Sequence, residues 1–173
     1  MHGFRSKHRH WRTGPRAIAP LVAALALLTW SHARALDCFV SVTGVAFGTY
    51  DPLVTTATTS TGNVQVRCVH LGGGAVRANY TVDLSQGSSN SYAQRTLRSG
   101  TSVLNYNLFN GATYTQIWGN GTGGSVRVAY SLLVNPGNFA VNVMDHPIYG
   151  RIPAQQAVDT GMYSDTILVT MTF

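Results

Sequence analysis

The stretch YSDTILVTMTF, residues 163–173, carries the clearest structural signal in this 173-residue chain. Its odd-numbered positions are mostly large and apolar, and its even-numbered positions are mostly small and polar. The odd-numbered row consists of Tyr163, Asp165, Ile167, Val169, Met171 and Phe173. A two-residue period is typical of a β-strand with one apolar and one polar face. The stretch therefore predicts a strand that either closes a finished sheet or borders a gap filled by another chain.

The first 35 residues differ in composition from the rest of the chain. Residues 1–16 hold five Arg or Lys residues and no acidic residue, and residues 21–28 form an apolar run of eight. A transmembrane anchor is the alternative, but a span needs about 20 apolar residues. The sequence SHARA at residues 31–35 offers an Ala-x-Ala cleavage site. We therefore predict a secretory signal over residues 1–35, cleaved after Ala35, and a mature domain over residues 36–173.

Cleavage after Ala35 changes the charge of the protein. Of the twelve Lys and Arg residues, six lie at or before Arg34, and the mature chain keeps six Arg, six Asp, no Lys and no Glu. The mature domain is therefore close to neutral. It has no basic patch of the kind that releases counterions from nucleic acid. This balance excludes a role in binding DNA or RNA.

The mature domain has the composition and the periodicity of an all-β protein. Gly, Thr, Val, Tyr and Asn are frequent, as expected for strands joined by turns. Alternating segments predict strands over 38–47, 63–69, 76–84, 103–109, 113–118, 126–134, 139–152 and 163–173. Seven or eight short strands without an amphipathic helix indicate a β-sandwich. Residues 85–101 are the longest predicted loop, and Pro147 predicts an edge or a bend within 139–152.

The mature chain contains two cysteines, Cys38 and Cys68. Each lies on the apolar face of its predicted strand, and an even cysteine count in an exported protein indicates a disulfide. A metal site is the alternative, but among histidines only His70 is close in sequence. We therefore predict a Cys38–Cys68 disulfide that closes a loop of about 30 residues.

No pattern in the mature chain predicts catalysis. His70 and His146 share no metal-ligand spacing with a carboxylate or thiol, and no Gly-x-Ser-x-Gly motif occurs. The glycines of HLGGGA, residues 70–75, join two predicted strands, whereas a phosphate loop leads into a helix. Asp145 and His146 stand beside Pro147 and are interpreted as turn residues. We predict a protein that is not an enzyme and has no metal, no cofactor and no small-molecule substrate.

Tyr114 and Trp118 are the candidate ligand surface. Together with Tyr106 and Phe109 they form an aromatic group that could bind a sugar, although aromatic residues on strands are also common in a core. A secreted adhesin module that binds a carbohydrate or a surface is therefore the alternative function.

Three strings carry a resemblance to a known family. They are CFVSVTGVAFGTYDP at residues 38–52, RTLRSGTSVLNYNLF at 95–109 with IWGNG at 117–121, and YGRIPAQQAVDTGMYSDTILVTMTF at 149–173. Together they resemble the spore coat protein U domain family, which includes subunits of archaic chaperone–usher pili in Gram-negative bacteria. The resemblance covers nearly the whole predicted mature chain.

The resemblance implies an incomplete immunoglobulin-like sandwich that a donor strand from another chain completes. It implies a periplasmic chaperone, an outer-membrane usher and other pilus subunits as partners, and a location on the cell surface in a pilus or coat. The row that would line the acceptor groove and bind the chaperone consists of Tyr163, Ile167, Val169, Met171 and Phe173.

One feature departs from the family pattern. A pilin that polymerises needs roughly ten alternating residues before its fold begins, to serve as a donor strand. Cleavage after Ala35 leaves only Leu36 and Asp37 before Cys38. Such a chain could accept a donor strand but could hardly supply one. We therefore expect a minor, tip-proximal or adaptor subunit, or a coat component, and not the repeating subunit of a fibre shaft.

Overall fold

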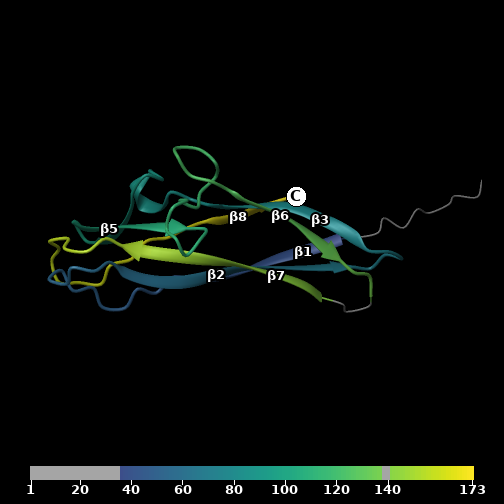
Figure 1. Cartoon of the computed structure of the whole chain (residues 1–173), viewed down its shortest axis with the longest axis horizontal. Coiled ribbons are helices and arrows are strands. Elements are labelled where there is room, and N and C mark those ends of the chain that lie inside the picture. Colours follow the sequence, from purple (N-terminus) through teal and green to yellow (C-terminus); the bar gives the residue numbers. More distant parts are fainter. Residues whose placement is uncertain (1–35, 138–140) are drawn as a thin grey trace, which may run out of the picture. The chain divides into compact units, whose positions relative to one another are not determined.

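The computed structural model describes residues 36–137 and 141–173, and within them the chain forms eight β-strands and one short 3₁₀ turn (Figure 1). The predicted signal, residues 1–35, lies outside the described residues. The elements are β1 (Leu36–Thr43), β2 (Thr58–His70), β3 (Val76–Leu84), η1 (Gly87–Ser89), β4 (Arg95–Ser99), β5 (Ser102–Phe109), β6 (Val128–Val134), β7 (Val141–Ile152) and β8 (Val169–Thr172).

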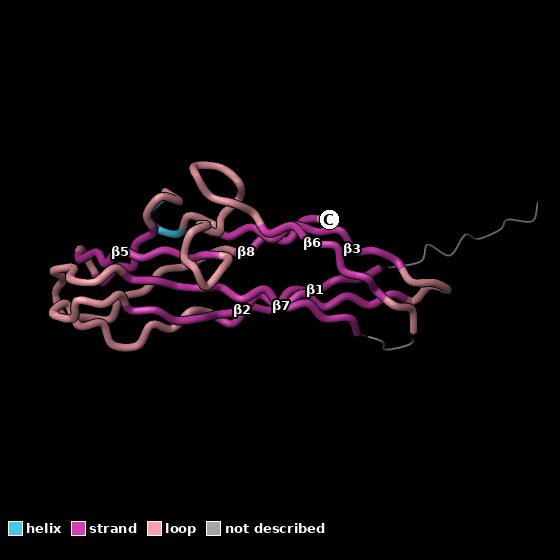
Figure 2. The backbone as a smooth tube through the Cα atoms, viewed as in Figure 1, coloured by secondary structure: helices cyan, strands magenta, loops and turns pink. Residues whose placement is uncertain are grey.

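The strands build two sheets. One sheet has five strands in the order β1-β2-β7-β5-β4, and the other has three in the order β6-β3-β8. All the pairings between these strands are antiparallel. Strands dominate the backbone trace between residues 36 and 173, and long loops gather beside β5 (Figure 2). The prediction of an all-β, immunoglobulin-like sandwich is confirmed.

The alternating sequence pattern determines which side chains enter the core. Val64, Val66 and Cys68 of β2 are fully buried, as are Val82 and Leu84 of β3, and the residues between them point outward. Burial of one such aliphatic side chain stabilises a fold by ~1.5–3 kcal/mol. The two-residue period therefore reports the inward face of each strand correctly.

The structure contains the predicted disulfide between Cys38 and Cys68. The two residues lie directly opposite each other in the β1–β2 ladder, with their Cα atoms 4.1 Å apart. Because β1 pairs with no strand other than β2 among the described elements, the disulfide attaches an edge strand covalently to the body of the sheet.

Two predictions of secondary structure are wrong, one of a strand and one of a loop. Residues 113–118 form no extended strand, because the chain turns back at Gly111, whose carbonyl accepts a hydrogen bond from Tyr114 N. Among the described residues, the segment pairs only through two isolated bridges, Phe109 with Ile117 and Trp118 with Val126. Within the predicted loop 85–101, residues 95–99 form β4. Sequence reasoning missed this strand because Arg95 reads as a polar, exposed residue, whereas its side chain is buried and its guanidinium donates four hydrogen bonds.

Pro147 lies inside β7, which runs without a break from Val141 to Ile152. At this position β7 pairs with β2 alone, because the β5 ladder reaches only residues 149–151. A proline, which has no N–H to donate, is therefore tolerated at a point where the strand has a single neighbour.

Across the described part of the chain, none of the elements is a helix with the length and hydropathy that crossing a membrane requires.

Candidate functional site: a groove between two open sheet edges

Among the described strands, each sheet ends in two that have a neighbour on one side only, and the candidate site lies along one such strand from each sheet, β1 and β8. In the described structure β1 pairs with β2 alone and β8 pairs with β3 alone, so β1 ends the five-stranded sheet and β8 ends the three-stranded sheet. An unpaired strand edge exposes main-chain N–H and C=O groups that can pair with another strand. The candidate site lies between these two edges, and we call the chain segments that border it on either side its banks.

The C-terminal bank consists of residues 163–172. Alternate residues of this segment use their main-chain N–H and C=O groups to bond to neighbouring segments of the same sandwich. Ser164 exchanges hydrogen bonds with Arg98 at 2.9 and 3.1 Å, and Leu168 exchanges hydrogen bonds with Ser85, both at 2.9 Å. Main-chain directions alternate along an extended strand. Ile167, Val169 and Met171 therefore direct their N–H and C=O groups to the edge that has no partner.

Side chains along this bank alternate as the sequence predicts. Tyr163, Ile167, Val169 and Met171 are half-buried and pack against the core. Phe173 is 67% exposed and does not join them, in contrast to the prediction for it. The regular strand is also shorter than predicted, because the chain pairs with β4 at Ser164 and with β3 only from residue 169 onward.

The opposite bank continues from β1 through residues 44–52. Val45 and Phe47 turn inward over two glycines of the sheet: a Cβ atom on Gly150 would lie 2.6 Å from Val45 Cγ1 and 2.7 Å from Phe47 Cζ, and one on Gly62 would lie 2.5 Å from Thr43 O. Larger residues at positions 62 and 150 would thus displace this bank.

Tyr50 anchors the far end of the same bank. Its hydroxyl donates a hydrogen bond to Pro153 O at 3.1 Å and accepts one from Gln156 N at 2.7 Å. These bonds tie residues 44–52 to the segment that follows β7, so the bank is held at both ends.

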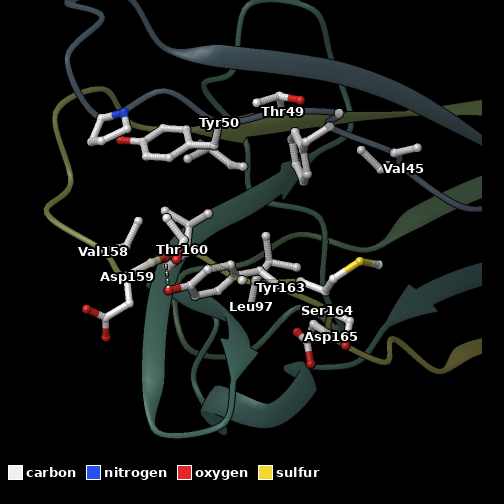
Figure 3. Close-up of a pocket in the computed structure, with 18 residues that line it drawn as sticks. Val45, Thr49, Tyr50, Leu97, Val158, Asp159, Thr160, Tyr163, Ser164 and Asp165 are labelled. Carbon is white, nitrogen blue, oxygen red and sulfur yellow. Dashed lines mark hydrogen bonds between the residues drawn. The ribbon is translucent and has the colours of Figure 1, made fainter.

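Two cavities lie between the banks and together form what we call the groove. The smaller, of about 190 Å³, reaches core residues Leu84, Leu108 and Ile148 beside Ile167 and Val169. The larger, of about 620 Å³, lies between residues 45–52 and 158–165 (Figure 3). Four residues line both cavities, so the groove is continuous: Val45, Phe47, Leu97 and Asp165.

Asp165 is the only charged residue of the odd-numbered C-terminal row. Its carboxylate accepts hydrogen bonds from Tyr106 Oη at 2.8 Å and from Ser88 N at 2.9 Å. Burial, followed by the hydrogen bond to Asp165, raises the pKa of Tyr106, so the phenol remains a donor. Asp165 therefore fastens the C-terminal bank to β5 and to the 3₁₀ turn.

The predicted aromatic ligand surface is wrong for Trp118. This side chain is 0% exposed, and its indole N–H donates to Val82 O at 2.9 Å. Tyr114 lies elsewhere: its half-buried ring packs against the rings of Phe109 and Tyr149, at centroid distances of 5.5 and 6.4 Å. The structure does not bring the two predicted residues together.

Asp145 and His146 are neighbours in β7 and not turn residues, so the interpretation of this pair as turn chemistry is wrong. His146 is buried, and its Nε2 lies 2.8 Å from Tyr80 Oη. Asp145 accepts from the side chains of Asn63 and Gln65, on the other face of the strand. Within residues 36–137 and 141–173, no three His, Cys, Asp or Glu residues are grouped as metal ligands.

The sequence prediction found one bank of the groove and missed the other. Val45 and Phe47 carry the same two-residue alternation as the C-terminal row, but the sequence placed them inside one predicted strand, 38–47, whereas β1 ends at Thr43. The glycines at positions 62 and 150, each at an inward-facing strand position, are the available signal that another segment packs there.

Comparisons with known proteins agree with this architecture. Residues 24–170 match the Spore Coat Protein U domain. Protein U of Myxococcus xanthus is 28% identical over 182 residues, which cover 91% of this chain and 97% of that protein. The fold is similar to a chain in the crystal structure of the CsuC-CsuE chaperone–tip adhesion subunit pre-assembly complex from archaic chaperone–usher Csu pili of Acinetobacter baumannii, with a TM-score of 0.53 and 24% identity. That similarity covers 80% of this chain and 40% of the other. The chain belongs to the Spore Coat Protein U domain family.

Proposed function

We propose that this protein is a structural subunit of a chaperone–usher pilus or coat on the surface of a Gram-negative bacterium. In this proposal the groove receives an extended segment of another polypeptide, which pairs with the open edges of β1 and β8. The observation that carries the proposal is the continuous, largely apolar groove between two strand edges that lack a neighbour among the described strands. Addition of a strand at such an edge is an established mode of protein recognition.

The energetics of the groove explain why such a subunit would need a partner. An inserted strand would place roughly four apolar side chains between the banks, at ~1.5–3 kcal/mol each, or on the order of 10 kcal/mol in total. This rivals the entire stability of a typical domain, about 5–15 kcal/mol. We infer that a periplasmic chaperone covers the groove first, and that an outer-membrane usher and a neighbouring subunit then replace the chaperone.

Family membership and the fold similarity to a chain of a chaperone–subunit complex support this proposal. The groove requires no cofactor and no catalytic turnover, because its binding energy comes from burial and main-chain pairing. The predicted signal over residues 1–35 supports export to the periplasm.

The finer role that we propose is a minor, tip-proximal or adaptor position. Leu36 and Asp37 already pair with His70 and Val69 in the β1–β2 ladder. If the signal is cleaved after Ala35, no unpaired residue precedes β1 to act as a donor. N-terminal sequencing of the mature protein tests this position, because a start about ten residues upstream of Leu36 would provide a donor segment.

The proposed groove is tested by a matched pair of substitutions on the C-terminal bank. Val169→Asp places a carboxylate in the groove, whereas Thr170→Asp places one on the exposed face of the same strand. We expect Val169→Asp to abolish recovery of the chaperone with the tagged subunit from the periplasm, and Thr170→Asp to leave it unchanged. Equal chaperone recovery with both variants would contradict the proposal.

A further inference from the structure

The two most exposed large apolar side chains of the described residues both stand beside the groove. Met162 is 91% exposed and Leu53 is 86% exposed. Met162 lines the larger cavity from the C-terminal bank, and Leu53 follows Pro52, which lines the same cavity from the opposite bank. We call these two residues the rim.

Hydrogen bonds close the turns that carry both rim residues. Leu53 N donates to Asp51 Oδ1 at 2.9 Å, and Val54 N donates to Asp51 O at 3.3 Å. Near Met162, the Tyr163 hydroxyl donates to Asp159 O at 2.9 Å, as Figure 3 shows.

The neighbouring backbone is also tightly packed. A Cβ atom on Gly161 would lie 2.5 Å from Ser99 Oγ, so the backbone next to Met162 packs closely against β4. Single exposed apolar side chains are common on protein surfaces. The rim differs because its two side chains stand at the same end of an apolar groove, one on each bank.

Strand direction indicates what covers the rim. The three-stranded sheet is antiparallel, and β8 runs from Val169 toward Thr172 beside β3. A segment that joins this sheet at the open edge of β8 in the same antiparallel way runs from the Phe173 end of the groove toward Tyr163, and it is then parallel to β1, which runs opposite to β8. Its C-terminal continuation then leaves the groove beside Met162 and Leu53. A domain that follows such a segment in its own chain is placed against the rim.

We propose that the rim is the docking surface for the folded domain of the neighbouring subunit whose N-terminal segment occupies the groove. This inference rests on the proposed function. A chaperone leaves during assembly, so it would leave the rim exposed in the finished fibre, whereas the neighbouring subunit remains. The rim thus adds a contact between folded domains to the contact made by the inserted strand.

Site-specific photo-crosslinking in isolated fibres or coats tests the rim. The full chain is produced with p-benzoyl-phenylalanine at Leu53, at Met162, at Val42 or at Leu71. Val42 lines the smaller cavity and reports on the groove. Leu71 is 64% exposed in the turn between β2 and β3, and is the matched control away from the groove. Adducts are digested and mapped by mass spectrometry.

We expect Val42 to crosslink to the N-terminal segment of one polypeptide, and the rim positions to crosslink to the folded domain of that same polypeptide. If the rim adducts are no more abundant than those of Leu71 while the Val42 adduct still forms, the rim is not a docking surface, and the proposed function is unaffected. Rim adducts to the chaperone alone would also overturn the docking surface. Absence of the Val42 adduct would contradict the proposed function, and with it the proposal that the rim is a docking surface.

A double variant provides a second readout. Leu53→Ser with Met162→Ser is expected to weaken retention of the neighbouring subunit roughly tenfold in a dilution assay, with the Val42 adduct still formed. Leu71→Ser is expected to have no effect. Unchanged retention in the double variant would contradict the docking surface.

Discussion

Arg95 is a fully buried cation, with 0% of its side chain exposed. Its guanidinium donates to Asn107 Oδ1 at 2.8 Å, to Trp118 O at 2.7 Å and to Ser85 O at 2.7 and 3.0 Å, and it lies 5.3 Å from the ring of Tyr92. Burial lowers the pKa of this guanidinium. Three acceptors from distant parts of the chain therefore depend on one side chain.

Arg95→Met is expected to destabilise the protein by about 3 kcal/mol or more, because buried acceptors that lose a donor cost about 1–3 kcal/mol each. The measurement is the free energy of unfolding in urea. Arg98→Met is the control, since Arg98 lies on the same strand and is exposed. Equal losses in both variants would show that the buried network is not the cause.

His146 makes the stability of the fold depend on pH. Burial lowers the pKa of His146, although the carboxylate of Asp145 opposes this effect. Its ring contacts Tyr80 of β3 and Tyr130 of β6. Burial, and secondarily Tyr130, raises the pKa of Tyr80 to about 12, so its hydroxyl remains protonated and can donate to the neutral imidazole.

A histidine whose pKa is lower in the folded state favours folding while it is neutral. Its contribution is present above about pH 6.5, the pKa of an unperturbed histidine, and is lost as the pH falls through the lower folded value. We expect the free energy of unfolding to fall as the pH is lowered from about 6.5 through the lower pKa of the folded state. His146→Gln is expected to flatten this dependence, and an unchanged slope would assign it to other groups.

At the scale of elements, the bank that follows β1, residues 44–52, depends on two glycines in the sheet beneath Val45 and Phe47, Gly62 and Gly150. Gly150→Ala is expected to displace Val45 and Phe47, with a loss of about 1–3 kcal/mol of stability, because the new Cβ overpacks that site. Chemical denaturation measures the loss. Gly73→Ala is the matched control, since a Cβ there has nothing within 4 Å. A similar loss in both variants would indicate a general effect of replacing glycine.

At the scale of the whole molecule, the open groove predicts that the chain alone is marginally stable. Produced in the periplasm without its chaperone, it is expected to be degraded or to aggregate. A strand of about ten alternating residues, linked after Phe173 through a short turn, should fill the groove in cis and restore yield. The measurement is the melting temperature of the two purified forms. A robust monomer that gains nothing from the added strand would contradict the open groove.

The sequence by itself determined most of the strands and which face of each is apolar, although it missed β4 and predicted a strand over 113–118 that the structure does not contain. Periodicity is a local property: the alternation of Val64, Val66 and Cys68 places all three in the core wherever the strand lies in the sheet. The same logic placed Cys38 and Cys68 on the apolar faces of their strands and identified Ile167, Val169 and Met171 as an inward row. These are the parts of the fold and the site that sequence reasoning could reach.

The tertiary structure alone decided what covers each face and each edge. Trp118 belongs to the core because its indole reaches Val82, and Arg95 is buried because Ser85, Asn107 and Trp118 surround it. The open edges of β1 and β8 follow from pairings between strands far apart in sequence. Contacts of that kind leave no local period, so the second bank of the groove and the rim could not be predicted from the order of residues.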